Sequence, residues 1–247
     1  SARGPRRRLG DERNTTVDRL SLDTKYCMGD TGDRSALSAK ILERLEPRLE
    51  QARRAVLEVA GTGMLVWTEL PRQDPQAYLD YAARAAGRFD SVLVIGIGGS
   101  ALGMLALSRA LLPFFHNELD TAQRAGRPRL YVLDNVDPDE TAALLDRLDL
   151  RRTLVNVISK SGMTGETMAG YLVVRERLEA VVGAAAVRDH LVFTTEPAGS
   201  TLRDIGDALG VRVFDLSPGV GGRFSVLSAV GLVPAALTGM DVSGLLA

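Results

Sequence analysis

The segment VISKSGMTGET, residues 157–167, places small hydroxyl groups and glycines directly after an aliphatic run. Ser159, Ser161 and Thr164 can each donate a hydrogen bond, and Lys160 adds a positive charge. Charge-assisted hydrogen bonds contribute about 1.5–3 kcal/mol each, so four or five of them could hold a phosphate monoester without an arginine clamp. The pattern therefore predicts a loop that binds the phosphate of a small molecule.

A helix is expected to begin immediately after this loop, near Glu166. Thr164 or a neighbour is placed to cap it, and the free N–H groups and positive dipole end of a helix favour a bound anion. Gly162 and Gly165 let the loop curl tightly. The alternative is an ordinary capped helix after a polar turn, with Lys160 pointing to solvent.

A second glycine-rich segment, GIGGSALG, follows the aliphatic run that begins at residue 91. Gly96, Gly98 and Gly99 carry no Cβ atom, so backbone N–H groups can approach a ligand closely, and Ser100 lies where a helix should begin. A tight turn with close helix packing would use the same residues.

The same segment matches the G-x-G-x-x-G/A pattern of dinucleotide-binding proteins, which is a competing interpretation. That pattern needs an acidic residue about 20 positions further on, at the end of the next strand. Asp134 is almost twice that distance from Gly96, which argues against a dinucleotide site.

A third segment, VGGRFSVLSAVGL, covers residues 220–232. Gly221 and Gly222 permit a close approach, and Arg223 follows at once. A planar cation delivered from a glycine turn can face negative charge that develops on an oxygen. A structural arginine would instead pair with an acid such as Asp215, and the spacing alone favours neither alternative.

The elements that must position these segments alternate regularly after residue 90. Five aliphatic runs are expected to be strands, at residues 91–99, 129–135, 153–159, 190–196 and 211–217, with helical patterns between them. Parallel neighbours need such crossovers, so the fold class is α/β, a five-stranded parallel sheet flanked by helices. In these sheets ligands bind outside the carboxyl ends of the strands, where the strand order reverses.

The first third of the chain is an α-helical segment. Apolar residues at a spacing of three to four predict an amphipathic helix over residues 37–60, which Pro47 bends or splits in two. A second helix is expected to end near Gly87. The expected domains are an N-terminal tail with a helical segment (1–88), a sheet domain (89–219), and the Gly-Gly-Arg turn with a connection (220–247).

Composition excludes several classes of protein. The net charge of -1 offers no general attraction for nucleic acid, although Arg3, Arg6, Arg7 and Arg8 make the first residues basic. No apolar run approaches the roughly 20 residues of a membrane helix. The single cysteine, Cys27, cannot form an internal disulfide, and we expect a cytoplasmic protein.

In this order, the three segments resemble the N-terminal half of the glucose-6-phosphate isomerase family, including its first sugar isomerase (SIS) domain. The resemblance runs from about residue 91 to at least residue 232 and implies a flavodoxin-like sheet, a sugar phosphate substrate and no cofactor or metal. It also implies a homodimer in the intact enzyme, without nucleic acid or membrane partners.

The resemblance further implies individual roles. The phosphoryl group is expected at Ser159, Lys160, Ser161 and Thr164, with Gly98, Gly99 and Ser100 beside the substrate. Arg223 is expected to steady a cis-enediolate, and Glu166 to have a supporting role without proton transfer.

The family's general base, its ring-opening histidine and a lysine lie in motifs downstream of Gly-Gly-Arg, which this chain does not contain. His116 and His190 match none of these motifs, so the chain alone is expected to bind a sugar phosphate without isomerising it. A sugar-phosphate sensor built on an SIS domain is the remaining alternative.

Overall fold

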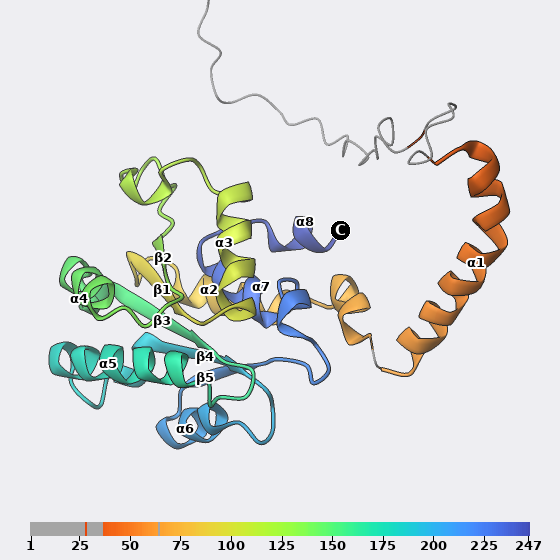
Figure 1. Ribbon diagram of the computed structural model, residues 1–247. Helices are drawn as coiled ribbons and strands as arrows, with labels where there is room; N and C mark the ends of the chain where they lie inside the picture. Colours follow the sequence, from red (N-terminus) through yellow and green to blue (C-terminus); the bar gives the residue numbers. More distant parts are fainter. Residues whose placement is uncertain (1–27, 29–36, 64) are drawn as a thin grey trace, which may run out of the picture. The chain divides into compact units, whose positions relative to one another are not determined.

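The computed structural model describes Met28, residues 37–63 and residues 65–247 (Figure 1). The N-terminal arginines and Cys27 lie outside these ranges. The chain divides into two compact units, residues 1–56 and 57–247. The second unit is larger than the expected sheet domain, 89–219, and extends beyond it on both sides. The limits of that domain stay a prediction.

The expected first helix is confirmed as α1, Ala39–Gly61. Pro47 lies inside it, and the helix is continuous along its 23 residues (Figure 1), so the split that Pro47 suggested does not occur. A proline in a helix removes one backbone hydrogen bond and crowds the preceding turn. In α1 the helical conformation nevertheless continues on both sides of Pro47.

Five parallel strands form one sheet in residues 57–247, and all five lie where the aliphatic runs predict them. They are β1 (Ser91–Ile95), β2 (Arg129–Leu133), β3 (Thr153–Ile158), β4 (Leu191–Thr195) and β5 (Arg212–Asp215). Their spatial order is β2-β1-β3-β4-β5, which is the flavodoxin-like order. The order therefore reverses between β1 and β3.

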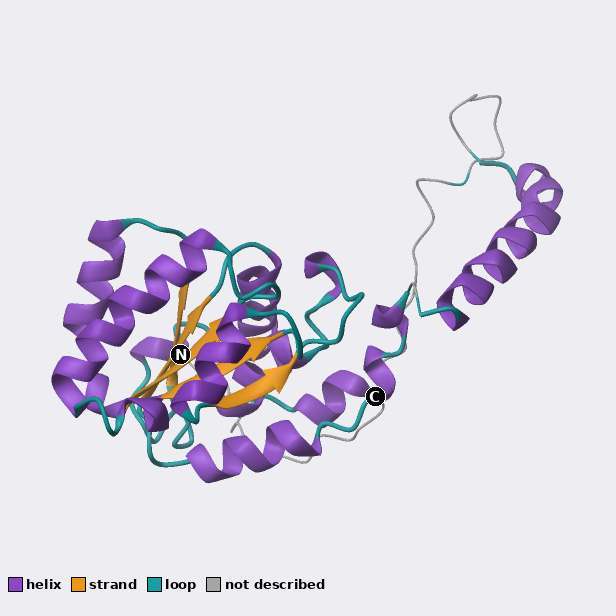
Figure 2. Cartoon of the chain, turned by 90° about the horizontal axis from the view of Figure 1, so that it is seen from below, coloured by secondary structure: helices purple, strands orange, loops and turns teal. Residues whose placement is uncertain are grey.

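Helices cover both faces of the sheet (Figures 1 and 2). One face carries α2 (Gln76–Ala85), α3 (Gly99–Leu111), α7 (Ala229–Leu237) and α8 (Val242–Leu246), and the other α4 (Pro138–Arg147), α5 (Gly165–Val182) and α6 (Thr201–Leu209). Short 3-10 helices complete the unit at Val66–Thr68, Leu70–Arg72, His116–Glu118, Leu150–Arg152, Val187–His190 and Gly222–Phe224. None of the helices that the structure describes is long and apolar enough to cross a membrane.

Side-chain alternation along the strands divides the apolar core in two. Val92 and Val94 face the layer of α2, α3 and α7, whereas Leu93 and Ile95 face α5. Every residue of α7 is buried. A helix that is apolar all round belongs inside a core, so α7 is an integral part of this unit.

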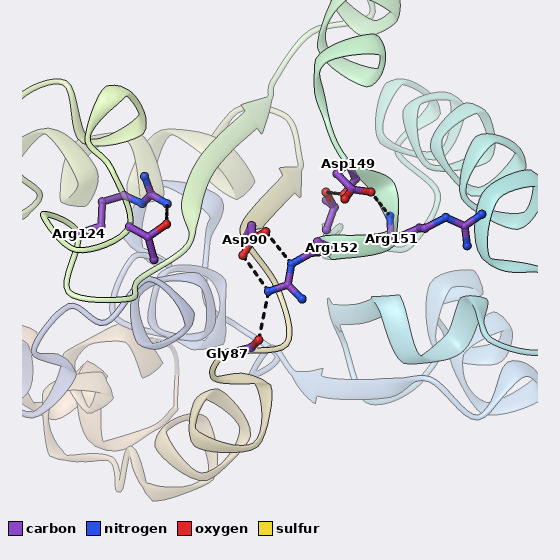
Figure 3. Close-up of polar contacts among 8 residues, drawn as sticks. Gly87, Asp90, Arg124, Asp149, Arg151 and Arg152 are labelled. Atoms are coloured by element: carbon purple, nitrogen blue, oxygen red, sulfur yellow. Dashed lines mark hydrogen bonds and ion pairs between the residues drawn. The ribbon is translucent and has the colours of Figure 1, made fainter.

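A surface ion pair fastens the amino ends of β1 and β3. Arg152 donates from Nε to Asp90 Oδ2 at 2.6 Å and from Nη2 to Asp90 Oδ1 at 2.9 Å (Figure 3). Arg152 also donates to the Gly87 carbonyl at 3.2 Å. The hydrogen bonds from Arg152 hold the pKa of Asp90 below its usual value.

Replacing Asp90 by Asn should destabilise the protein slightly and in a pH-dependent way. A carboxylate with a depressed folded-state pKa contributes stability above its unfolded pKa, about 4, and loses it as the pH falls through the folded-state value. Both side chains are about half exposed, so the expected loss at pH 7 is only about 1–3 °C in Tm. Thermal melts at pH 7 and in steps below pH 4 should show this difference disappearing; a constant difference would contradict the charge-based explanation.

Candidate functional site

The reversal of strand order brings two of the three segments together. Ile95 lies opposite Val157 in the register of β1 and β3. The turns that follow these strands, residues 96–100 and 159–164, therefore leave the sheet side by side at its carboxyl edge. This is the position at which open parallel sheets bind ligands.

The hydroxyl-rich loop is held by its own serines. Ser159 is buried, and its Oγ accepts a hydrogen bond from the Gly162 N–H at 3.1 Å and donates to Thr164 Oγ1 at 3.2 Å. The exposed Ser161 accepts at Oγ from the Met163 N–H at 3.2 Å. The loop thus gathers the predicted hydroxyls into one tight turn with an exposed side.

The N-terminus of α5 opens onto this turn. Thr164 occupies the N-cap position, as predicted, but its side chain makes no capping hydrogen bond. In the described part of the chain, the N–H groups of Gly165, Glu166 and Thr167 have no acceptor, and the first helical bond runs from the Met168 N–H to the Thr164 carbonyl. Three unpaired N–H groups at a helix start favour a bound anion.

Lys160 lies beside an acidic residue that the sequence analysis did not consider. Its Nζ lies 3.6 Å from Glu196 Oε1, and the two side chains are 43% and 26% exposed. Glu196 therefore offsets part of the positive charge that Lys160 would otherwise direct at an incoming anion. Glu166 is exposed in the first turn of α5.

The Gly-Gly-Ser turn has a backbone that requires glycine. Gly98 has φ 56° and ψ −121° and precedes α3. It is exposed, while Gly99 and Ser100 are half-buried. The turn therefore presents main chain to its surroundings, and its approach to a ligand stays a prediction.

The Gly-Gly-Arg segment packs directly on this turn. A Cβ atom added to Gly99 would lie 2.6 Å from the Cα of Gly222, so the two main chains are in contact. Ser225 fastens the contact, because its Oγ lies within 2.7 Å of the Gly222 carbonyl and 3.4 Å of the Gly99 carbonyl. The structure therefore brings the second and third segments together.

Arg223 lies in the 3-10 helix Gly222–Phe224 and is exposed. Asp215, the acid that a structural arginine would have used, is paired with Arg203 instead. Among the described residues Arg223 has no ion-pair partner within 4.0 Å. Phe224, the residue after Arg223, stacks on Trp67 with ring centroids 4.9 Å apart. This stack holds the chain in place directly after Arg223.

Sequence reasoning missed two buried hydroxyls behind the loop, Thr195 and Ser200. Thr195 Oγ1 lies 3.2 Å from the Lys160 carbonyl and 2.5 Å from Ser200 Oγ. The hydroxyl-bearing run TTEPAGS, residues 194–200, begins in the last two residues of β4 and could have indicated these groups. Its meaning depends on β4 lying beside β3.

The two histidines lie away from this corner. His190 precedes β4 and its Nδ1 is 3.0 Å from the carbonyl of Thr153, the first residue of β3. His116 is buried, with Nε2 3.0 Å from the Pro128 carbonyl, just before β2. Both are therefore at the amino ends of strands, opposite the candidate site. The described residues contain no group of three or more His, Cys, Asp or Glu that could hold a metal ion.

Fold and site define a parallel α/β protein of flavodoxin-like strand order, whose switch point carries a hydroxyl-rich loop, a glycine turn and a helix start with unpaired N–H groups. Sequence comparison is more specific: the family described as "PGI: Phosphoglucose isomerase" matches residues 79–245. The chain belongs to the phosphoglucose isomerase family.

Curated relatives carry the corresponding name. Glucose-6-phosphate isomerase of Carboxydothermus hydrogenoformans is 44% identical over 178 residues, 72% of this chain and 38% of that protein. A counterpart in Thermus thermophilus is 40% identical over 230 residues, 92% and 50% of the two chains. The chain therefore spans about half the length, or less, of these relatives.

Solved structures agree with this relationship. A protein from Thermus thermophilus, described as hypothetical, superposes with a TM-score of 0.74 at 41% identity, over 84% of this chain and 48% of that one. A glucose-6-phosphate isomerase from Chlamydia trachomatis gives a TM-score of 0.57 at 31% identity, over 70% and 30%. The family match leaves the dinucleotide-binding alternative without support.

Proposed function

We propose that this chain forms the phosphate-binding half of an aldose–ketose isomerase that interconverts glucose 6-phosphate and fructose 6-phosphate. The family match and the names of the relatives support this reaction. The resemblance also carries our expectation of a homodimeric enzyme that acts in the cytoplasm without a cofactor.

One observation carries the proposal: the three segments adjoin at the switch point of the sheet. The register of β1 and β3 supports the pairing of the first two, and the contact between Gly99 and Gly222 supports the third. In this arrangement Ser159, Ser161 and Thr164 with the start of α5 would hold the phosphoryl group. Gly98, Gly99 and Ser100 would then lie along the sugar.

Arg223 is proposed to act on the intermediate. When a base removes the C2 proton of the open-chain aldose, a C1=C2 double bond forms and the carbonyl electrons move onto O1, which gives a cis-enediolate. A proton then passes from the C2 hydroxyl to O1, and the base returns its proton to C1, which gives the ketose. A guanidinium near that oxygen stabilises charge that is present only in the transition state and the intermediate. The exposed position of Arg223, without an acidic partner among the described residues, suits this role.

The general base is expected to come from the part of the relatives that this chain does not match. Neither histidine lies at the proposed site, and a general base must come within hydrogen-bond reach of the proton it removes. We therefore expect the chain by itself to bind sugar phosphates and not to isomerise them.

Removing two hydroxyls should test the phosphate loop. The double change Ser161→Ala with Thr164→Ala should weaken 6-phosphogluconate binding about tenfold or more, as expected for the loss of one or two charge-assisted hydrogen bonds. Isothermal titration calorimetry measures this affinity, and gluconate, which lacks the phosphate, shows how much depends on the phosphoryl group.

The matched control changes two exposed hydroxyls outside the loop, Thr121→Ala with Ser243→Ala. Unchanged affinity in the loop variant would mean that the phosphate binds elsewhere on the protein.

Thermal-shift titration of the unchanged chain separates the three candidate functions. Stabilisation by fructose 6-phosphate supports the isomerase, stabilisation by NAD supports a dinucleotide site, and stabilisation by amino-sugar phosphates alone supports a sensor.

A further inference from the structure

We propose that Thr195 and Ser200 are positioning residues that orient the Lys160–Ser161 peptide for phosphate binding. The proposal rests on the function proposed above and adds two residues from β4 and the start of α6. Neither residue touches the exposed side of the loop, since both are completely buried. Their effect on a ligand must pass through the main chain of the loop.

A continuous series of hydrogen bonds connects α6 to the loop. The Arg203 N–H donates to Ser200 Oγ at 3.4 Å, Ser200 Oγ lies 2.5 Å from Thr195 Oγ1, and Thr195 Oγ1 lies 3.2 Å from the Lys160 carbonyl. A carbonyl can only accept, so the single proton of Thr195 goes to Lys160. Ser200 must then donate its own proton to Thr195. Each hydroxyl therefore has one possible orientation.

The Lys160 carbonyl receives a second hydrogen bond from the same side. The Glu196 N–H donates to it at 3.1 Å. Both lone pairs of this carbonyl are then used by residues at the end of β4. The peptide cannot rotate without breaking both bonds, so its plane is fixed.

This fixed plane determines where the next N–H points. In a trans peptide the N–H of residue 161 points opposite to the carbonyl of residue 160. The carbonyl points toward β4, and β1 lies on the other side of β3. The Ser161 N–H is therefore turned toward the side of the Gly-Gly-Ser turn, and no acceptor for it is found among the described residues.

The loop is also supported from behind at Gly162. This residue has φ +67°, and a Cβ atom on it would lie 2.5 Å from the Leu202 nitrogen and 3.0 Å from the Leu202 Cβ. The main chain of the loop thus rests on the first turn of α6. Packing fixes its position, while the hydroxyl pair fixes the direction of one peptide.

Replacing Thr195 by Val tests the hydroxyl without changing the shape of the side chain. We expect the Kd for 6-phosphogluconate to rise about five- to tenfold, because the Ser161 N–H is no longer held in a binding orientation. Thr195→Ser keeps the hydroxyl and should bind within about twofold of the unchanged chain. The amide resonance of Ser161 in a ¹H–¹⁵N spectrum should move in Thr195→Val before any ligand is added.

A matched control separates positioning from stability. Thr238, the C-cap residue of α7, is also fully buried, and its Oγ1 donates to the Pro234 carbonyl at 2.8 Å. Thr238→Val should lower Tm without changing the affinity or the Ser161 resonance. Equal binding by Thr195→Val and the unchanged chain, or equal losses in Thr195→Val and Thr195→Ser, would overturn the positioning role. Failure of the unchanged chain to bind any sugar phosphate would overturn the proposed function instead.

Discussion

Replacing Arg223 by Ala, in a protein extended to the full length of its relatives, is expected to lower kcat by about 100- to 1,000-fold with little change in KM. The size is that of losing one preorganised donor to a developing oxyanion. The effect falls on kcat because an enediolate oxygen carries its charge only after the substrate has bound. Steady-state kinetics in both reaction directions provide the measurement.

Arg223→Lys should recover only part of this loss, since an ammonium group cannot reproduce the planar fork of a guanidinium. Arg109→Ala, at an exposed arginine of α3, is the control for loss of a positive charge. If Arg223→Ala raised KM and left kcat unchanged, Arg223 would be a substrate-binding residue, and its transition-state role would be wrong.

Gly99→Ala should be a strongly damaging small substitution at the site. The added methyl group would meet the Cα of Gly222 at 2.6 Å, and main chain cannot move aside as a flexible side chain can. We expect a loss of about 1–3 kcal/mol in the free energy of unfolding. Urea denaturation measures it, and in a full-length enzyme turnover should fall as well because the Gly-Gly-Arg turn is displaced.

Gly165→Ala is the matched control for this substitution. Gly99 and Gly165 are the first residues of α3 and α5, and neither has a positive φ. A Cβ atom on Gly165 meets nothing within 4 Å, so its stability should stay the same or rise through reduced freedom of the unfolded chain. Equal losses in the two variants would show that helix starts in general, and not the contact with Gly222, are sensitive.

Most of the fold was predictable because its strands are buried on both faces. Runs such as residues 91–95 and 153–158 are aliphatic with little interruption, and glycine, proline or polar clusters separate them from the helical patterns. The α/β class and the parallel sheet followed from this alternation. The order of the strands did not, because crossover length does not say on which side of β1 the next strand is added.

The candidate site was predictable in its parts and not in its connections. The hydroxyls of residues 159–164 and the glycines of residues 96–99 are visible as unusual local composition. The contact of Gly99 with Gly222 joins residues 123 positions apart, and no local pattern indicates it. Thr195 was overlooked for the same reason, since a buried threonine in a strand is ordinary until its neighbouring strand is known.

The burial of α7 affects how the protein is made. Tyr78 and Leu79 of α2, near the start of the larger unit, pack into the same core as Val230 and Val233 of α7, near its end. Because a chain leaves the ribosome from its N-terminus, one side of the sheet must wait until α7 has emerged. Until then an aliphatic surface is exposed on the nascent chain, and chaperones that recognise such surfaces can bind to it.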